Sequence, residues 1–407
     1  MLSVGVIGGG TAGAEAAREA SRDGADVTVL ERSPEPEPPW KDWPDLFLCR
    51  HGTVGNELPP SSVPRNLPVI NAEVKAIEGG RVVCSDGSNV RFDAVIAATG
   101  SVFVPPSFQG HRKPGVYLLG SAHAYSDLGR RRDFQRPVVT GEGIRALRVA
   151  DCLAGEGGDV QTVVTKWRLG APSPDTYDIV ERCAGERGVT IMRGSVTRAV
   201  GLGSVEAATV AGRVLPADSL IVLPDRMPRV VPSGARLGDS GGFSVDEGLR
   251  TSSTSVFASG ACAELQRARS PPRVFDEEPK MTGRIAGANS VGHTLTVSPS
   301  RFLEVRLFGL RWSVSITNTN DEFVPPASKG VVSRRWGPES ACTITFERGS
   351  GRVLRVERVE PACDSHVEMA SLGAVGVSLQ TLAFAESSDI SLVSDTARLG
   401  LRLWSNS

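Results

Sequence analysis

The chain has 407 residues and is close to neutral, with 45 Lys and Arg against 46 Asp and Glu. This balance gives no electrostatic reason to expect nucleic acid or an anionic membrane as a partner. Apolar residues make up 40% of the chain, and no apolar run reaches the roughly 18 residues that a membrane span needs. The seven cysteines form no Cys-x-x-Cys pair, which argues against a disulfide framework or a zinc ribbon. Composition therefore predicts a cytoplasmic, multidomain protein without a membrane span.

The first 31 residues have the pattern of strand, glycine-rich turn, helix and second strand. A short apolar strand, Ser3 to Ile7, runs into Gly8-Gly9-Gly10-Thr11-Ala12-Gly13. An alanine-rich helix is expected to follow as far as Arg22, and a second strand from Asp26 to Leu30 ends at Glu31. This order of elements is typical of a dinucleotide-binding unit.

The chemistry of such a site explains these residue types. Gly8 allows the tight turn, Gly10 lets the backbone approach a pyrophosphate, and Gly13 lets the helix lie close to the sheet. The start of the helix offers free N–H groups and the positive end of its dipole to phosphates. Glu31 lies 18 residues after Gly13, where a carboxylate accepts hydrogen bonds from a ribose diol. The alternative is a unit that keeps the glycines only for packing.

A second unit of the same kind begins near residue 136. The strand Arg136 to Thr140 precedes Gly141-Glu142-Gly143-Ile144-Arg145-Ala146, a helix is expected to about Ala154, and Val160 to Val164 is a further strand. The ribose-binding acid is missing here, and the chain reads Thr165-Lys166-Trp167-Arg168. Basic residues at this place either meet a 2′-phosphate, favouring NADP over NAD, or lie on a solvated loop without cofactor preference.

Several further segments carry a family resemblance. Val83-Cys84-Ser85-Asp86-Gly87 and Phe92 to Gly100, which ends in Ala98-Thr99-Gly100, resemble a segment of flavoproteins in the pyridine nucleotide–disulfide oxidoreductase family. Gly241 to Asp246 with Val256-Phe257-Ala258-Ser259-Gly260 is similar to the second FAD-binding segment of that family, and Met281 to Gly292 to the helix after it. Leu215 to Pro228 resembles the strand and proline that close its NAD domain. From Phe302 onward, with a hairpin expected at Arg348-Gly349-Ser350-Gly351, the chain is similar to the C-terminal domain of NADH oxidases and coenzyme A disulfide reductases.

The resemblance implies an α/β fold with two Rossmann-like dinucleotide-binding domains, for FAD and NAD(P), and a C-terminal α+β domain of the dimerisation type. The FAD domain would be discontinuous, with residues 1–107 and 229–293 enclosing the NAD(P) domain at 108–228, and residues 294–407 would form the C-terminal domain. Its cofactors would be FAD and NAD(P)H, and the protein would be a homodimer. The cofactor-binding residues would be Gly8, Gly10, Thr11, Ala12, Gly13, Glu31, Arg32, Thr99, Gly100, Gly260 and Ala261 for FAD, and Gly141, Gly143 and Ala146 for NAD(P).

One cysteine is a candidate catalytic residue. The segment Asp45-Leu46-Phe47-Leu48-Cys49-Arg50-His51-Gly52 resembles the context of the single redox cysteine in the NADH oxidase branch, although Cys49 lies farther from Glu31 than the family spacing. Arg50 and His51 beside it would stabilise a thiolate. The thiolate would then cycle with a sulfenate or a mixed disulfide beside the flavin. The alternative is a half-buried cysteine that packs as a small hydrophobe. The five histidines form no cluster with ligand spacing, so no metal is expected.

Departures from the family pattern keep several functions open. Ala261 stands where the family carries an Asp that holds the flavin, and Ile144 and Arg148 replace an aromatic and an acidic residue of the second unit. The first hypothesis is an NAD(P)H oxidoreductase that passes electrons from FAD through Cys49 to a thiol, disulfide or oxygen. The second is a cysteine-independent reductase of a small redox protein or quinone. The third is a nucleotide-binding subunit without turnover.

Overall fold

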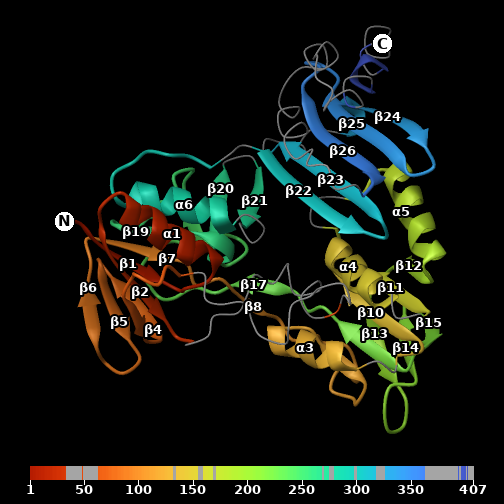
Figure 1. The fold of residues 1–407 in the computed structure, drawn as a ribbon, viewed down its shortest axis with the longest axis horizontal. Helices are drawn as coiled ribbons and strands as arrows, with labels where there is room; N and C mark the ends of the chain where they lie inside the picture. The colour runs from red at the N-terminus through yellow and green to blue at the C-terminus, as the bar shows by residue number, and fades with distance from the viewer. Residues whose placement is uncertain are drawn as a thin grey trace.

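The computed structural model describes residues 1–33, 48, 63–131, 134–154, 159–167, 171–267, 270–274, 279–297, 300–317, 326–362, 393, 396–399 and 401. Within them the chain forms two parallel sheets, several small antiparallel sheets and one large antiparallel sheet. Figure 1 shows the first parallel sheet at one end of the molecule, with the second parallel sheet and the large antiparallel sheet at the other.

The first parallel sheet contains the amino-terminal unit. Its strand order is β19-β7-β1-β2-β3, formed by Val256–Ala258, Ala94–Ala97, Ser3–Ile7, Asp26–Glu31 and Val69–Asn71. Helix α1, Thr11–Arg22, covers this sheet beside α6, Pro279–Ser290. The alanines of α1 are fully buried, and their small side chains let the two helices approach closely. Gly283 and Gly287 of α6 complete this contact, because a Cβ at either position would meet the α1 backbone at 2.3 or 2.5 Å.

Two small sheets, one antiparallel and one mixed, are inserted around this sheet. The strands β4 (Val74–Glu78), β5 (Arg81–Cys84) and β6 (Asn89–Arg91) form a meander between β3 and β7. A second small sheet contains β18 (Phe243–Val245), β20 (Ala263–Arg267) and β21 (Ser270–Val274). The short 3₁₀ turn η2, Gly260–Cys262, connects β19 to β20 and packs against α1 and α6.

The second parallel sheet has the order β12-β11-β10-β16-β9. Its strands are Val189–Arg193, Val160–Val164, Pro137–Gly141, Ser219–Val222 and Val116–Leu118. The helices α3 (Ala122–Arg130), α4 (Gly143–Ala154) and α5 (Pro174–Glu186) belong to this unit, and the antiparallel strands β13 (Val196–Val200), β14 (Ala207–Val210) and β15 (Arg213–Pro216) lie beside it. Two short paired strands, β8 (Ser101–Phe103) and β17 (Arg226–Pro228), connect the two parallel-sheet units.

The carboxyl-terminal part is an antiparallel sheet in the order β22-β23-β26-β25-β24. Its strands are Ser300–Leu307, Leu310–Thr317, Val353–Pro361, Ser340–Glu347 and Lys329–Gly337, with the 3₁₀ turn η3 (Pro326–Ser328) before β24. The expected hairpin at residues 348–351 is confirmed, since β25 and β26 pair antiparallel around it. This sheet packs on α4 and α5 (Figure 1), and the buried carboxylate of Glu357 ties it to α5 by accepting from the Ser173 N–H at 3.0 Å.

The fold class predicted from the sequence is thus confirmed as two Rossmann-like units and a carboxyl-terminal sheet domain. The ends of β1 and β11 agree with the sequence to the residue, and those of α1 and β10 to within one. No helix in the described part of the chain has the length and hydropathy of a membrane-spanning helix.

Candidate functional site

The first glycine turn is tightly constrained by its neighbours. Gly8 has φ +103°, and its N–H donates to the carbonyl of Leu30 at 2.8 Å. A Cβ on Gly8 would lie 2.4 Å from the carbonyl oxygen of Ala98, and a Cβ on Gly13 would lie 1.8 Å from that of Gly8. Only glycine therefore fits these two positions, and Gly13 brings α1 against the end of β1.

Gly10 differs from its neighbours in the turn. It is the N-cap residue of α1, with φ −66° and ψ −175°, a conformation open to any residue. A Cβ there would meet nothing within 4 Å. The space above the start of α1 is therefore open, at a place where helix N–H groups and the helix dipole favour a phosphate.

Glu31 lies beside this turn, at the end of β2. Its carboxylate accepts the N–H of Gly9 at 2.5 Å and the N–H of Ser33 at 2.9 Å. A carboxylate fixed in this way faces the same space as the helix start and retains acceptor capacity for hydroxyl groups. Neighbouring parallel strands end here together, which is where open α/β sheets bind their ligands.

A cavity of about 530 Å³ joins these elements, within the usual size of a ligand pocket. Its walls come from the ends of β1, β2 and β7, from the β8 linker and from the segment before α3. The residues that line it include Gly8, Gly10, Glu31, Arg32, Thr99, Gly100, Phe103, Gly120, Ser121 and Arg229. Six of the predicted FAD-binding residues thus line one cavity, at a place built from both parallel-sheet units.

Arg229 is a cavity residue that sequence reasoning missed. Burial, and then the nearby charge of Arg32, lower the pKa of its guanidinium. Glu73 pairs with it at 3.3 Å, and the Thr99 hydroxyl donates to its carbonyl. The lining therefore carries two cations beside the carboxylates of Glu31 and Glu73, and an anionic group of a ligand is favoured where it meets the cations. The sequence signal was slight, because Arg229 follows Pro228 and lies far along the chain from Glu31 and the first glycine turn.

The remaining FAD candidates are not among the residues that line the cavity. Thr11 begins α1, and Ala12 is buried in its first turn. Gly260 has φ +67°, and a Cβ on it would approach that of Ala12 to 2.8 Å. Its N–H donates to the Thr282 hydroxyl of α6 at 3.1 Å, while Ala261 is buried in η2. The turn η2 thus buttresses the start of α1.

The residues of the cavity fit FAD. The open space over Gly10 would take the pyrophosphate, and Glu31 stands where it would accept from the adenosine ribose. Arg32 and Arg229 would offset the phosphate charge. Ala261, by contrast, provides no side-chain anchor for the flavin.

The second glycine turn is arranged differently. Gly141 ends β10, Gly143 begins α4, and Ala146 is fully buried in that helix. None of the three lines the cavity described above. The space over Gly143 is occupied, because a Cβ there would lie 2.3 Å from Cε3 of Trp167. In this conformation the residues do not fit a nicotinamide nucleotide at the turn.

Cys49 lies outside the described residues, so its redox role stays a prediction. Among the described cysteines, Cys84, Cys183, Cys262 and Cys342 are free and buried. The fifth, Cys152 on α4, is disulfide-bonded. Burial raises the pKa of Cys262 and Cys342, which keeps both thiols protonated and unreactive at neutral pH.

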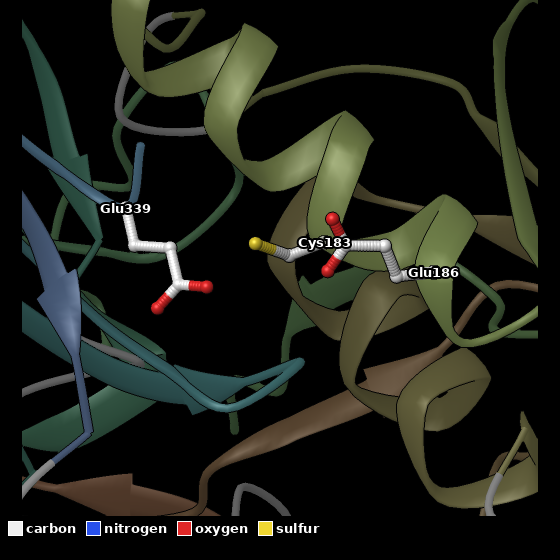
Figure 2. A group of neighbouring side chains, drawn as sticks. All are labelled: Cys183, Glu186 and Glu339. Carbon is white, nitrogen blue, oxygen red and sulfur yellow. The ribbon is translucent and has the colours of Figure 1, made fainter. Parts of the chain in front are cut away.

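A cluster of three possible ligands lies between α5 and the turn after β24. Figure 2 shows the Cys183 sulfur between the carboxylates of Glu186 and Glu339, and the ligand atoms lie within 4.8 Å of one another. Arg182 already pairs with Glu186 at 2.6 Å, and burial raises the pKa of the Cys183 thiol. A protonated thiol is a poor metal ligand, so we assign no metal to this cluster.

Comparison with known proteins identifies a family whose members this chain resembles in sequence. The model of the pyridine nucleotide-disulphide oxidoreductase family matches residues 2–282. The rubredoxin-NAD(+) reductase of Pseudomonas putida is 28% identical over 282 residues, which are 64% of this chain and 72% of that protein. The CoA-dependent NAD(P)H sulfur oxidoreductase of Pyrococcus abyssi is 25% identical over 336 residues, 74% of each chain.

A solved structure extends the likeness to the whole chain. The NAD-dependent persulfide reductase from A. fulgidus superposes with a TM-score of 0.84 at 21% identity, covering 100% of this chain and 84% of that one. At this identity the likeness concerns the fold alone, and it includes the carboxyl-terminal sheet. Because the family model spans well over half of the chain, the chain belongs to the pyridine nucleotide-disulphide oxidoreductase family, which confirms the prediction of an FAD-dependent NAD(P)H oxidoreductase.

Proposed function

We propose that this oxidoreductase delivers electrons from FAD to a sulfur acceptor, a disulfide or persulfide, through Cys49. The observation that carries the proposal is the cavity at the ends of β1, β2 and β7, which fits FAD in a chain of this family. The acceptor class is supported by the curated relative named as a sulfur oxidoreductase and by the sequence context of Cys49. Bound FAD would supply the redox chemistry by accepting two electrons and passing them on.

The chain's own residues would hold and orient the cofactor. The first turn of α1 would bind the pyrophosphate through backbone N–H groups. Glu31 would accept from ribose hydroxyls while Gly9 and Ser33 fix its carboxylate. Arg229, held through its carbonyl by Thr99, would face the phosphates together with Arg32. The linker residue Phe103 would exclude water from one side of the cavity.

Cys49 would act as the group that meets the acceptor. Its thiolate would attack one sulfur of a disulfide, and the other sulfur would leave as a thiol after taking up a proton. Cleavage of the remaining mixed disulfide, which restores the Cys49 thiolate and releases the second thiol, needs one proton and two electrons, and bound FAD would supply the electrons. The charges of Arg50 and His51 beside it in the sequence would lower its pKa and favour the thiolate.

The test is the Cys49→Ser variant, with Cys84→Ala on β5 as the matched control. We expect Cys49→Ser to keep its bound FAD and lose turnover with disulfide and persulfide acceptors, while Cys84→Ala keeps both. Full turnover of Cys49→Ser with these acceptors would refute the role of Cys49.

A second candidate is direct reduction of a small redox protein, which the rubredoxin-NAD(+) reductase relative favours. In that case the Cys49→Ser variant would retain its rate with a rubredoxin or ferredoxin as acceptor. From the family resemblance we also propose a homodimer in the cytoplasm. Sedimentation of the full chain as a monomer at micromolar concentration would contradict the dimer.

A further inference from the structure

The two glycine turns of this chain can be compared position by position. In the first unit, Ile7 pairs with Leu30 on the neighbouring strand, and Glu31 follows. In the second unit, Gly141 pairs with Val164, so Val164 stands where Glu31 stands in the first. The Val164 side chain is 2% exposed. The second unit therefore presents no carboxylate to a ribose at this place.

The space over the second turn is filled by an aromatic ring. Gly10 and Gly143 are the second glycines of the two Gly-x-Gly patterns that begin at Gly8 and Gly141. Nothing lies within 4 Å of a Cβ on Gly10. A Cβ on Gly143 would lie 2.3, 2.8 and 3.0 Å from three atoms of the Trp167 indole. The ring thus covers the surface that a pyrophosphate would need to contact.

The backbone of the same segment forms hydrogen bonds with one N–H and one carbonyl of the turn. The N–H of Gly143 donates to the carbonyl of Lys166 at 2.8 Å, and the N–H of Thr165 donates to the carbonyl of Gly141 at 2.9 Å. The Lys166 ammonium pairs with Asp225 at 2.8 Å. Residues 165–167 are therefore folded back over the turn, and the amide at the helix start is already satisfied.

Trp167 also joins the turn to the carboxyl-terminal sheet. Its ring packs edge to face against Trp312 of β23, with centroids 5.9 Å apart. Trp312 is itself fixed, since it is buried and donates its Nε1–H to Glu357 at 3.1 Å. The Nε1–H of Trp167, in contrast, is buried and finds no acceptor among the described residues. An unpaired buried donor is unfavourable, so the ring gains a hydrogen bond when it moves out to water.

We propose that Trp167 is a gate on the second glycine turn: its ring occupies the place of the pyrophosphate of a nicotinamide nucleotide, which binds only after the ring has left Gly143. The inference rests on the proposed function, in which NAD(P)H is the electron donor. Only molecules with an open turn bind the nucleotide. The apparent affinity for the nucleotide is therefore the affinity of the open form multiplied by the fraction of molecules that are open. Contact with Trp312 makes this fraction sensitive to the position of the carboxyl-terminal sheet.

The experiment measures binding of NAD⁺ and NADP⁺, which cannot reduce the flavin, to the purified FAD-loaded protein by calorimetry. Trp167→Ala removes the gate, and Trp167→Phe reduces its size while keeping an aromatic ring against Trp312. Trp336→Ala on β24 is the matched control, a tryptophan that pairs with Arg334 at a distance from the turn. If the ring is closed in about nine molecules of ten, Trp167→Ala binds its preferred nucleotide about tenfold more tightly than the unchanged protein. Trp167→Phe gives a smaller gain, and Trp336→Ala gives none.

Equal or weaker binding of both nucleotides to Trp167→Ala and to Trp167→Phe would overturn the gate, because the ring would then be neutral or would support the nucleotide. Melting curves confirm that each variant is folded. A separate titration with NADH and NADPH under anaerobic conditions distinguishes the two proposals. Tighter nucleotide binding to Trp167→Ala without reduction of the flavin supports the gate and refutes NAD(P)H as donor. Reduction of the flavin without tighter binding to Trp167→Ala supports NAD(P)H as donor and refutes the gate.

Discussion

Replacing Gly10 with alanine separates cofactor binding from folding in this protein. In the structure, Gly10 has a backbone conformation open to alanine, and the added Cβ would meet no atom within 4 Å. The apoprotein is therefore expected to keep its stability to within about 1 kcal/mol, because alanine restricts the unfolded chain but is less favourable than glycine at an N-cap. With FAD, the same Cβ would stand where the pyrophosphate meets the start of α1.

The loss of affinity follows from one hydrogen bond. A hydrogen bond to a charged group contributes about 1.5–3 kcal/mol, so displacement of the phosphate from one N–H weakens FAD binding about 10- to 150-fold. Apoprotein of both forms is titrated with FAD while the quenching of flavin fluorescence is followed, and thermal unfolding is measured without the cofactor. An unchanged dissociation constant, or an apoprotein that no longer folds, would refute the reasoning.

Gly13→Ala is the control, with the same chemical change one helical turn away. Its Cβ would lie 1.8 Å from the carbonyl oxygen of Gly8, a distance that α1 can relieve only by moving off the sheet. This variant is expected to lose the fold of the first unit with or without FAD. The contrast between the two glycines tests the placement of the cofactor and not merely the sensitivity of a glycine-rich turn.

Three further predictions concern charge and pH. Glu31→Gln removes the anionic acceptor beside Gly9, and we expect at least about tenfold weaker FAD binding in the same fluorescence titration; equal affinity would place the ribose elsewhere. Although burial opposes ionisation of Glu15, hydrogen bonds from Arg284 and Arg18 lower the pKa of its carboxyl group below 4.5. The ionised Glu15 therefore stabilises the folded protein above pH 4.5, and this stability is lost as the pH falls through the lowered pKa. Arg284→Gln should reduce stability at pH 7 and flatten this acid loss in denaturant titrations; a curve parallel to that of the unchanged protein would contradict it. Burial raises the pKa of the Cys342 thiol from 9.0 to about 12, so the stability of the folded protein should decline between pH 9 and 12. Cys342→Ala should weaken this decline, and an identical decline in the variant would exclude the thiol as its source.

The sequence predicted those features that depend on neighbours along the chain. The turn from β1 to α1 could be recognised because Gly8 and Gly13 meet backbone atoms that any such turn brings close. The strands Ser3–Ile7 and Val160–Val164 could be recognised from their apolar runs. The hairpin between β25 and β26 followed from its glycine-rich turn.

Features that depend on contacts between distant segments could not be predicted in this way. Arg229 reaches the cavity because β17 pairs with β8, a contact that nothing in the local sequence indicates. Trp167 was noted in the sequence only as part of a loop with basic residues. Its position over Gly143 depends on Trp312, which comes from another domain more than a hundred residues later. The boundaries of the four predicted domain segments, and the role of Cys49, remain predictions.

The most direct test of the account is the visible absorption spectrum of the purified protein during anaerobic titration with NADH and NADPH. We expect a yellow protein whose flavin absorbance bleaches with at least one of the two nucleotides. A long-wavelength charge-transfer band on reduction would further place a thiolate against the flavin, as expected for Cys49. A protein that binds no flavin after addition of FAD, or one whose flavin neither nucleotide reduces in the unchanged or the Trp167→Ala form, would contradict it.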